Sequence, residues 1–153
     1  MDDPYRHIFD KAPLGYLVIE QQGLVVLANR AWRTLMGLPP QTDPVGRPFR
    51  EFVPPNWFEM HGDQLLAVRS SDEVESFEME VWHTDGEQRY LAMDVNAGED
   101  GFAVSGPIIY CLFRDITTRK RAEIALRASE KARRMMQREL DQQRALAISS
   151  DRM

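Results

Sequence analysis

The order of hydrophobic and polar residues predicts short strands in the first part of the chain and one long helix at its end. Five segments either alternate between apolar and polar residues or are rich in β-branched and aromatic ones, which is typical of strands. They are residues 16–19, 24–27, 77–82, 89–95 and 107–113. Residues 30–36 and 56 to about 70 have helical spacing. This order predicts an α+β fold, an antiparallel sheet with short helices on one face.

The helix predicted at 30–36 has a capping residue at each end. Asn29 precedes it and can accept a hydrogen bond from the first turn. Gly37 follows it and suits the left-handed conformation that ends helices. We expect Ala31, Leu35 and Trp32 to face inward. The second helix is expected to bury one face, made by Trp57, Met60, Leu65, Leu66 and Val68.

Composition changes sharply near residue 115. All nine prolines and all nine glycines lie before it, and the residues after it favour helix. A helix over 118–153 needs a partner to be stable. A heptad seam is approximated by Ala122, Leu126, Ser129, Arg133, Met136 and Leu140. Its serine and arginine predict a weak coiled coil. The alternative is an amphipathic helix folded back on its own domain.

The bulk composition narrows the class of protein. A chain of 153 residues that is 43% hydrophobic can form one domain and some extra structure. Its net charge of −5 gives no overall basic field for nucleic acid. The single cysteine, Cys111, excludes an internal disulfide, and no Cys/His spacing predicts a metal site. Without an apolar run of about 20 residues, we expect no direct membrane insertion and a cytoplasmic location.

Several short stretches, taken in order, resemble the PAS sensor-domain family. They are Ile8–Gly15, Gly23–Gly37, Val45–Phe49, Thr84–Gly86 and Arg114–Thr117, which reads Arg-Asp-Ile-Thr. The resemblance implies a five-stranded antiparallel sheet flanked by short helices, whose inner face forms a small pocket or a filled core. It also implies a sensory role, because members mostly sense a ligand, light, redox state or a partner and pass the result to an attached output module.

The resemblance divides the chain into a PAS sensor domain at 1–117 and a signalling helix at 118–153 that leads to an output domain. In similar proteins such a helix commonly precedes a sensor histidine kinase, so a two-component kinase is the first interpretation. We expect a homodimer through the helix and the PAS surface. The alternatives are a PAS domain that regulates a cyclic-dinucleotide enzyme or a transcription activator, and a ligand-free interaction scaffold with a filled core.

A stand-alone enzyme is not favoured by the sequence. It contains no nucleophile motif, no phosphate-binding glycine loop and no carboxylate pair with a reason to be close, so no catalytic residue is predicted. The basic residues Arg119–Arg121 and Arg133–Arg134 are interleaved with acids. A solvated helix face is therefore expected there, and not a nucleic-acid interface.

His61 is the candidate haem ligand. The stretch Pro54–His61 resembles oxygen-sensing haem PAS domains, in which a histidine on the long helix binds iron. Such a ligand is a neutral imidazole that faces an apolar pocket. The same helix start also occurs without haem, and 77–82 has no arginine for a gas site, so a solvent-facing or locally hydrogen-bonded histidine is the alternative. His7 and His83 are expected at the surface.

Flavin is the other cofactor that the resemblance suggests. Light-sensing relatives carry a reactive cysteine in the region that corresponds to 44–52, and here that region has none. A cysteinyl adduct is thus excluded, whereas non-covalent flavin stays open beside haem and no cofactor at all. Cys111 is expected to be a small core residue. The residues expected to line the pocket are Trp32, Leu35, Met36 and Trp57.

Asp115 and Thr117 stand where the last strand ends and the long helix begins. A side-chain oxygen of either residue can cap that helix. The resemblance implies that this Asp-Ile-Thr junction couples the sheet to the output helix. We therefore expect a change in the pocket to alter strand packing around Tyr110 and Leu112, and the junction to convert it into rotation or splaying of paired helices.

Overall fold

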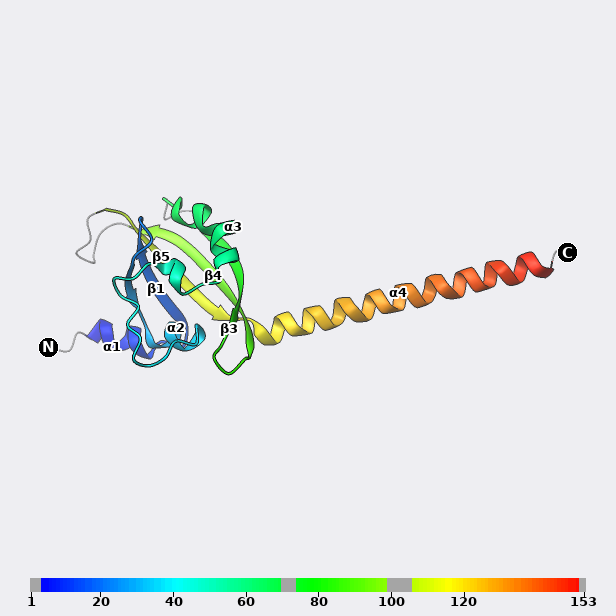
Figure 1. Ribbon diagram of the computed structural model, residues 1–153, viewed down its shortest axis with the longest axis horizontal. Coiled ribbons are helices and arrows are strands. Elements are labelled where there is room, and N and C mark those ends of the chain that lie inside the picture. Colours follow the sequence, from blue (N-terminus) through cyan, green and yellow to red (C-terminus); the bar gives the residue numbers. More distant parts are fainter. Residues whose placement is uncertain (1–3, 70–73, 99–105, 152–153) are drawn as a thin grey trace. The chain divides into compact units, whose positions relative to one another are not determined.

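The computed structural model describes residues 4–69, 74–98 and 106–151. Two compact units make up the chain, Met1–Ile116 and Thr117–Met153. The helices and strands of the first unit are α1 (Pro4–Lys11), β1 (Gly15–Glu20), β2 (Val25–Ala28), α2 (Arg30–Leu35), the 3-10 helix η1 (Phe49–Glu51), α3 (Pro55–Leu66), β3 (Glu75–Trp82), β4 (Gln88–Gly98) and β5 (Ile108–Asp115). The second unit is one helix, α4 (Thr117–Asp151). The predicted α+β fold is confirmed (Figure 1).

One five-stranded sheet organises the first unit. Its strand order is β2-β1-β5-β4-β3, and every neighbouring pair is antiparallel. The chain passes from β2 at one edge to β3 at the opposite edge through α2, η1 and α3 (Figure 1). In the middle of the sheet, Leu17 of β1 lies opposite both Ala28 of β2 and Cys111 of β5. The last strand is therefore central and pairs with β1 and β4.

The inner face of the sheet carries the hydrophobic core. Alternate residues of each strand face it, as period-two burial along β3 shows. The inward strand residues are Leu17, Ile19, Phe77, Met79, Val81, Leu91, Met93, Val95, Ala97, Ile109, Cys111 and Phe113. Trp32 of α2, Phe49 of η1 and Leu65 of α3 pack against them and are fully buried. Burial of these large apolar side chains supplies most of the driving force for folding.

Two sequence predictions about helices are wrong. The second helix ends at Leu66 and not near residue 70, because the side chain of Arg69 bonds the carbonyl of Leu66 and closes the last turn. Met60 was expected inward but is 77% exposed. Trp57, His61 and Leu65, spaced four residues apart, define the inward face, and Met60 points away from it. Helix α1 was not predicted at all.

Asn29 is the buried polar residue that joins three parts of the first unit. Its Oδ1 accepts from the backbone N–H of Tyr16 at 2.9 Å and of Trp32 at 3.0 Å. Its Nδ2 donates to the carbonyls of Phe9 at 3.0 Å and Leu14 at 2.9 Å. The predicted cap on α2 is confirmed, and the same side chain also holds α1 and β1. All of its hydrogen-bonding capacity is used, so its burial carries little penalty.

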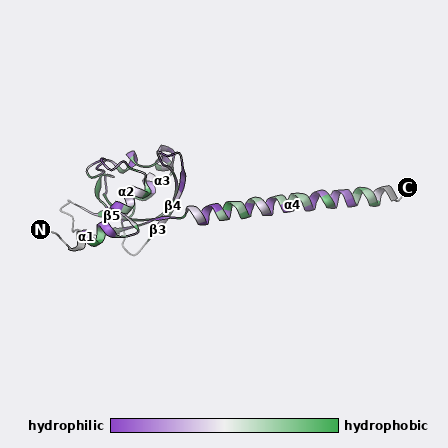
Figure 2. Ribbon diagram, turned by 90° about the horizontal axis from the view of Figure 1, so that it is seen from below, coloured by the Kyte–Doolittle hydropathy of each residue, from purple (hydrophilic) through white to green (hydrophobic). Residues whose placement is uncertain are grey.

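The long helix α4 has 35 residues and exposes apolar side chains along its length. Leu126 is 61% exposed and Met136 is 66% exposed. Figure 2 shows hydrophobic and hydrophilic residues alternating along this helix. Across the described residues, no helix is both long and apolar enough to cross a membrane.

Cys111 lies on the inner face of β5 and is a free, buried thiol. The prediction that it is a core residue is confirmed. Burial raises the pKa of its thiol well above the usual range, because the thiolate would lose its hydration. The thiol is therefore held in its protonated, unreactive form.

Replacement of Asn29 by alanine should lower the free energy of unfolding by about 3 kcal/mol, because two buried N–H groups and two carbonyls lose their partner. Urea denaturation of the 153-residue chain measures this. The control is Asn56→Ala, an exposed residue in the first turn of α3, with an expected change within about 0.5 kcal/mol. A loss below about 1 kcal/mol for Asn29→Ala would contradict the role assigned to this side chain.

Cys111 should react with an aromatic disulfide reagent at least about a hundredfold more slowly in the native protein than in guanidinium, since access requires opening of the core. Release of the coloured thiol follows the reaction. The control is the double variant Cys111→Ala/Ala128→Cys, which places the thiol on the exposed surface of α4 outside the predicted heptad seam. It should react at nearly the same rate in both conditions. Rapid native labelling of Cys111 would show that the inner face opens readily.

Candidate functional site

One wall of the inner face is formed by α2 and carries three of the predicted pocket residues. Trp32 and Met36 are buried there, and Leu35 packs partly buried against the same cluster. The Trp32 ring meets Phe52 edge-on at 5.8 Å and Phe113 at 6.2 Å between ring centroids. These contacts are favourable aromatic geometries and hold the indole in one orientation. The structure thus brings Trp32 and Leu35 of α2 together with Met36, the residue that caps its C-terminal end.

The indole N–H of Trp32 is buried and has no hydrogen-bond partner. Buried tryptophan N–H groups usually have one, and each exception requires an explanation. Trp57, the fourth predicted pocket residue, follows the usual rule, because its Nε1 donates to the carbonyl of Glu78 at 2.8 Å. The N–H of Trp32 is therefore a hydrogen-bond donor on an otherwise apolar face. It can donate to an acceptor atom of a small bound molecule or to a water.

His61 lies on α3 among aromatic rings. Its ring centroid is 5.1 Å from that of Trp57 and 5.6 Å from that of Phe77, and the side chain is half-buried. A haem ligand needs an apolar cavity in front of one ring nitrogen. In this region the buried side chains of Trp57, Phe77 and Phe49 contact one another. The role of His61 as a haem ligand stays a prediction.

The prediction that His83 lies free at the surface is wrong. Its ring is half-buried, and Nε2 is 2.7 Å from the carbonyl oxygen of Leu35, at the end of α2. The ring lies against Gly37, whose positive φ of 69° confirms the predicted helix stop. A residue with a side chain at Gly37 would collide with the imidazole. His7 is exposed, as expected.

The junction before α4 is held by a charged pair and a backbone bond. Asp115 ends β5, and its carboxylate is 3.6 Å from Arg89 of β4. Arg89 also pairs with Glu87 at 2.7 Å, in the turn that precedes β4. Next along the chain, the N–H of Ile116 donates to the carbonyl of Tyr90 at 2.9 Å. Both residues of the predicted junction are thus placed: Asp115 is tied to β4, and Thr117 begins α4 and is buried. Their capping role stays a prediction.

Sequence reasoning missed Arg89 and Glu87. The alternation of β4 shows that Arg89 belongs to a strand, but only the register, with Leu91 opposite Asp115, brings the arginine beside the end of β5. That register depends on pairing between strands far apart in the sequence. No local pattern in the sequence therefore identifies the pair.

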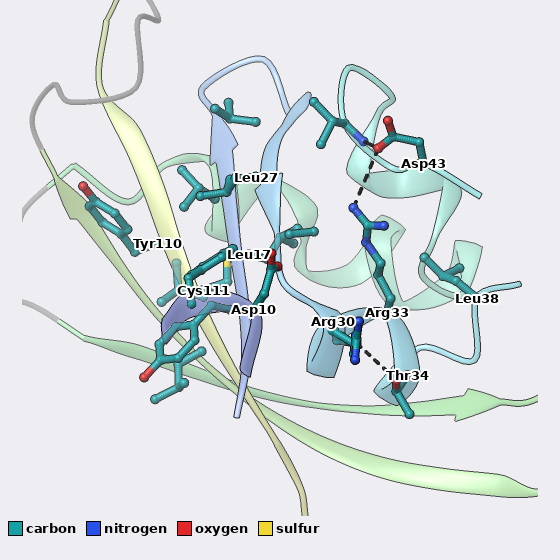
Figure 3. Close-up of a pocket in the computed structure, with 18 of the residues that line it drawn as sticks. Asp10, Leu17, Leu27, Arg30, Arg33, Thr34, Leu38, Asp43, Tyr110 and Cys111 are labelled. Atoms are coloured by element: carbon teal, nitrogen blue, oxygen red, sulfur yellow. Dashed lines mark hydrogen bonds and ion pairs between the residues drawn. The ribbon is translucent and has the colours of Figure 1, made fainter. Parts of the chain in front are cut away.

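A groove of about 1610 Å³ that was not predicted lies in the first unit (Figure 3). Its apolar lining includes Phe9, Tyr16, Val18, Leu27, Tyr110 and Leu112. Arg33 of α2 faces Asp43 across part of it at 3.9 Å. The sequence feature that could have predicted this groove is the run of consecutive apolar residues in β1 and β5. Such runs indicate that both faces of a strand are covered by other parts of the protein.

The sequence model of the PAS fold family matches residues 4–101. Among curated proteins, no sequence matches the chain. The PAS domain of an HTR-like protein from Haloarcula marismortui is 18% identical, with a TM-score of 0.60 over 73% of this chain and 88% of that chain. The PAS domain of BvgS from Bordetella pertussis is 21% identical, with a TM-score of 0.56 over 84% of this chain and 95% of that chain.

A sensory box histidine kinase/response regulator from Burkholderia thailandensis is 18% identical, with a TM-score of 0.61 over 86% of this chain and 98% of that chain. At identities this low, similar structures show a common fold and not a common ligand. The fold agrees with the family match, which spans the helices and strands from α1 through β4. The chain therefore belongs to the PAS family of signalling domains.

Proposed function

We propose that this chain is the sensory and dimerisation module of a two-component sensor histidine kinase. The observation that carries the proposal is the junction: Asp115, tied to Arg89, is followed directly by a helix of 35 residues. The similar protein from Burkholderia thailandensis is a sensory box histidine kinase/response regulator, and the similarity extends over 86% of this chain. The output domain is proposed to lie elsewhere in the same polypeptide.

The proposed sensory site is the inner face beside α2. Its walls are apolar, and the donor of Trp32 is buried without a partner. An ionic ligand would lose its hydration there without a charged partner, at a cost of several kcal/mol. The site therefore favours a small, uncharged molecule with one hydrogen-bond acceptor for Trp32. Binding behind α2 would move a helix that Asn29 and His83 hold at its two ends.

The proposed dimer forms through α4. A helix that exposes Leu126, Met136 and Leu140 along one seam gains stability when a second copy covers these side chains. Ser129 and Arg133 interrupt the seam and weaken it. A weak seam suits a signalling helix, because two arrangements of the paired helices then differ little in free energy and a small change at the junction can shift their populations.

A ligand-free interaction scaffold is the second candidate, and one observation favours it. The aromatic rings of the core pack against one another, with Trp57 in contact with Phe49 and Phe77, and Trp32 with Phe52 and Phe113. A core that is already filled would sense a partner at its surface and not a molecule in its interior. In that case the groove that includes Tyr16 and Tyr110 is the surface available to a partner.

The two candidates are separated by mass spectrometry of the purified chain under native and denaturing conditions. The sensor predicts a small molecule that is retained by the native protein and released on denaturation. Trp32→Phe keeps an aromatic ring and removes the donor, so retention should fall about fivefold, the effect of one lost hydrogen bond. The control is Trp82→Phe on the outer face of β3. A wild-type chain that carries no molecule, even after incubation with a cell extract, would favour the scaffold.

Asp115→Ala in the chain joined to its output domain should change both basal output and its response to the signal, because the tie between β5 and β4 is lost directly before α4. Arg89→Ala should have the same effect, and the double variant should be no worse than either single one. Autophosphorylation measures the output. Asp63→Ala, an exposed acid on α3, is the control. An unchanged output and response in Asp115→Ala would exclude the proposed coupling.

A further inference from the structure

His83 joins two parts of the first unit that are 48 residues apart in the sequence. The carbonyl of Leu35 can only accept, so the 2.7 Å contact requires Nε2 of His83 to carry the proton. The last carbonyls of a helix have no partner within the helix and must find one elsewhere. His83 supplies that partner at the end of α2. The imidazole therefore joins the end of α2 to the turn between β3 and β4.

The contact between His83 and Leu35 is constrained on both sides. Gly37 leaves room for the ring, since a Cβ at that position would lie 2.9 Å from Cγ of His83. On the other side, the backbone N–H of His83 donates to the carbonyl of Glu87 at 2.9 Å, and its carbonyl accepts from Gly86 at 2.9 Å. These two bonds close the turn and hold the histidine backbone. Because His83 is held on both sides, a movement of α2 should also displace the turn.

The same turn leads directly to the signalling junction. Glu87, at its end, pairs with Arg89 at 2.7 Å, and Arg89 pairs with Asp115 at 3.6 Å. The N–H of Ile116 is bonded to Tyr90, the residue after Arg89. Hydrogen bonds and ion pairs therefore run without a break from the end of α2 to the last residues of the first unit. The inner core takes no part in this route.

We propose that His83 is a positioning residue that couples α2 to the junction through the β3–β4 turn, beside any coupling through the sheet itself. The inference rests on the proposed sensory function for its biological use. The coupling itself depends only on contacts within the first unit. When α2 is displaced, the His83 bond breaks, the turn loosens, and the pair between Arg89 and Asp115 loses its fixed geometry. Coupling of this kind is reciprocal, so a change at Asp115 must also be felt at α2.

Hydrogen exchange of the 153-residue chain tests the coupling in both directions. The reporter amides at the end of α2 are those of Gly37 and Leu38, which donate to Thr34 and Arg33. The reporter at the junction is the amide of Ile116. Exchange at each amide measures the free energy of local opening, so a perturbation is located residue by residue.

His83→Ala should speed exchange about fivefold at Gly37, at Leu38 and also at Ile116, which corresponds to the loss of a hydrogen bond of about 1 kcal/mol. His83→Gln retains a side-chain N–H donor and should restore part of the protection. The control is His7→Ala, an exposed histidine in α1, with no change at these amides. Faster exchange at α2 alone, with Ile116 unchanged, would show that His83 is only a local cap and would overturn the proposal.

Asp115→Asn supplies the reciprocal measurement and keeps the test decisive if His83→Ala unfolds the protein. It should speed exchange at Gly37 and Leu38 at least about twofold, although Asp115 ends β5 and these amides lie at the end of α2. Asp63→Asn removes an equal charge from the exposed face of α3 and should leave both amides unchanged. Unchanged exchange at Gly37 and Leu38 in Asp115→Asn would overturn the coupling. That result would not contradict the proposed sensory function, which is tested separately by ligand retention and by output.

Discussion

Asn29 loses all of its contact with water and replaces it with four hydrogen bonds to the backbone. The partners belong to α1, to β1 and the residue before it, and to α2, so one side chain sets where α2 begins relative to the sheet. A buried amide is tolerated only when its donors and acceptors are all satisfied. The position of α2, and with it the inward direction of Trp32 and Met36, depends on this constraint.

The core that Asn29 borders is almost wholly apolar, and this limits the ligands that the proposed sensory site could bind. Hydrophobic burial is non-directional, so the inner face can exchange one apolar occupant for another at small cost. The unpaired N–H of Trp32 is a directional feature within it. A site of this kind discriminates by size and by one hydrogen bond, which is consistent with the proposed uncharged ligand.

Around the apolar core, polar contacts join the parts that are proposed to move together. His83 bonds the end of α2, and Arg89 bonds the end of β5. Such surface pairs contribute little stability, about 0.5 kcal/mol or less for an exposed ion pair. Because each is weak, it can break and re-form as a ligand or partner changes. The core thus supplies most of the stability of the fold, whereas the proposed signalling role belongs to the weak contacts around it.

Residue periodicity and local backbone preferences were enough to predict the strands, the short helix with its Asn29 cap and Gly37 stop, and the uninterrupted final helix. They could not show that Met60 faces outward, that His83 bonds Leu35 or that Arg89 meets Asp115, which depends on the folded chain. These contacts join residues that are far apart in the chain, and their partners are chosen by strand register and helix packing. A local sequence pattern carries no information about a partner that folding brings from elsewhere.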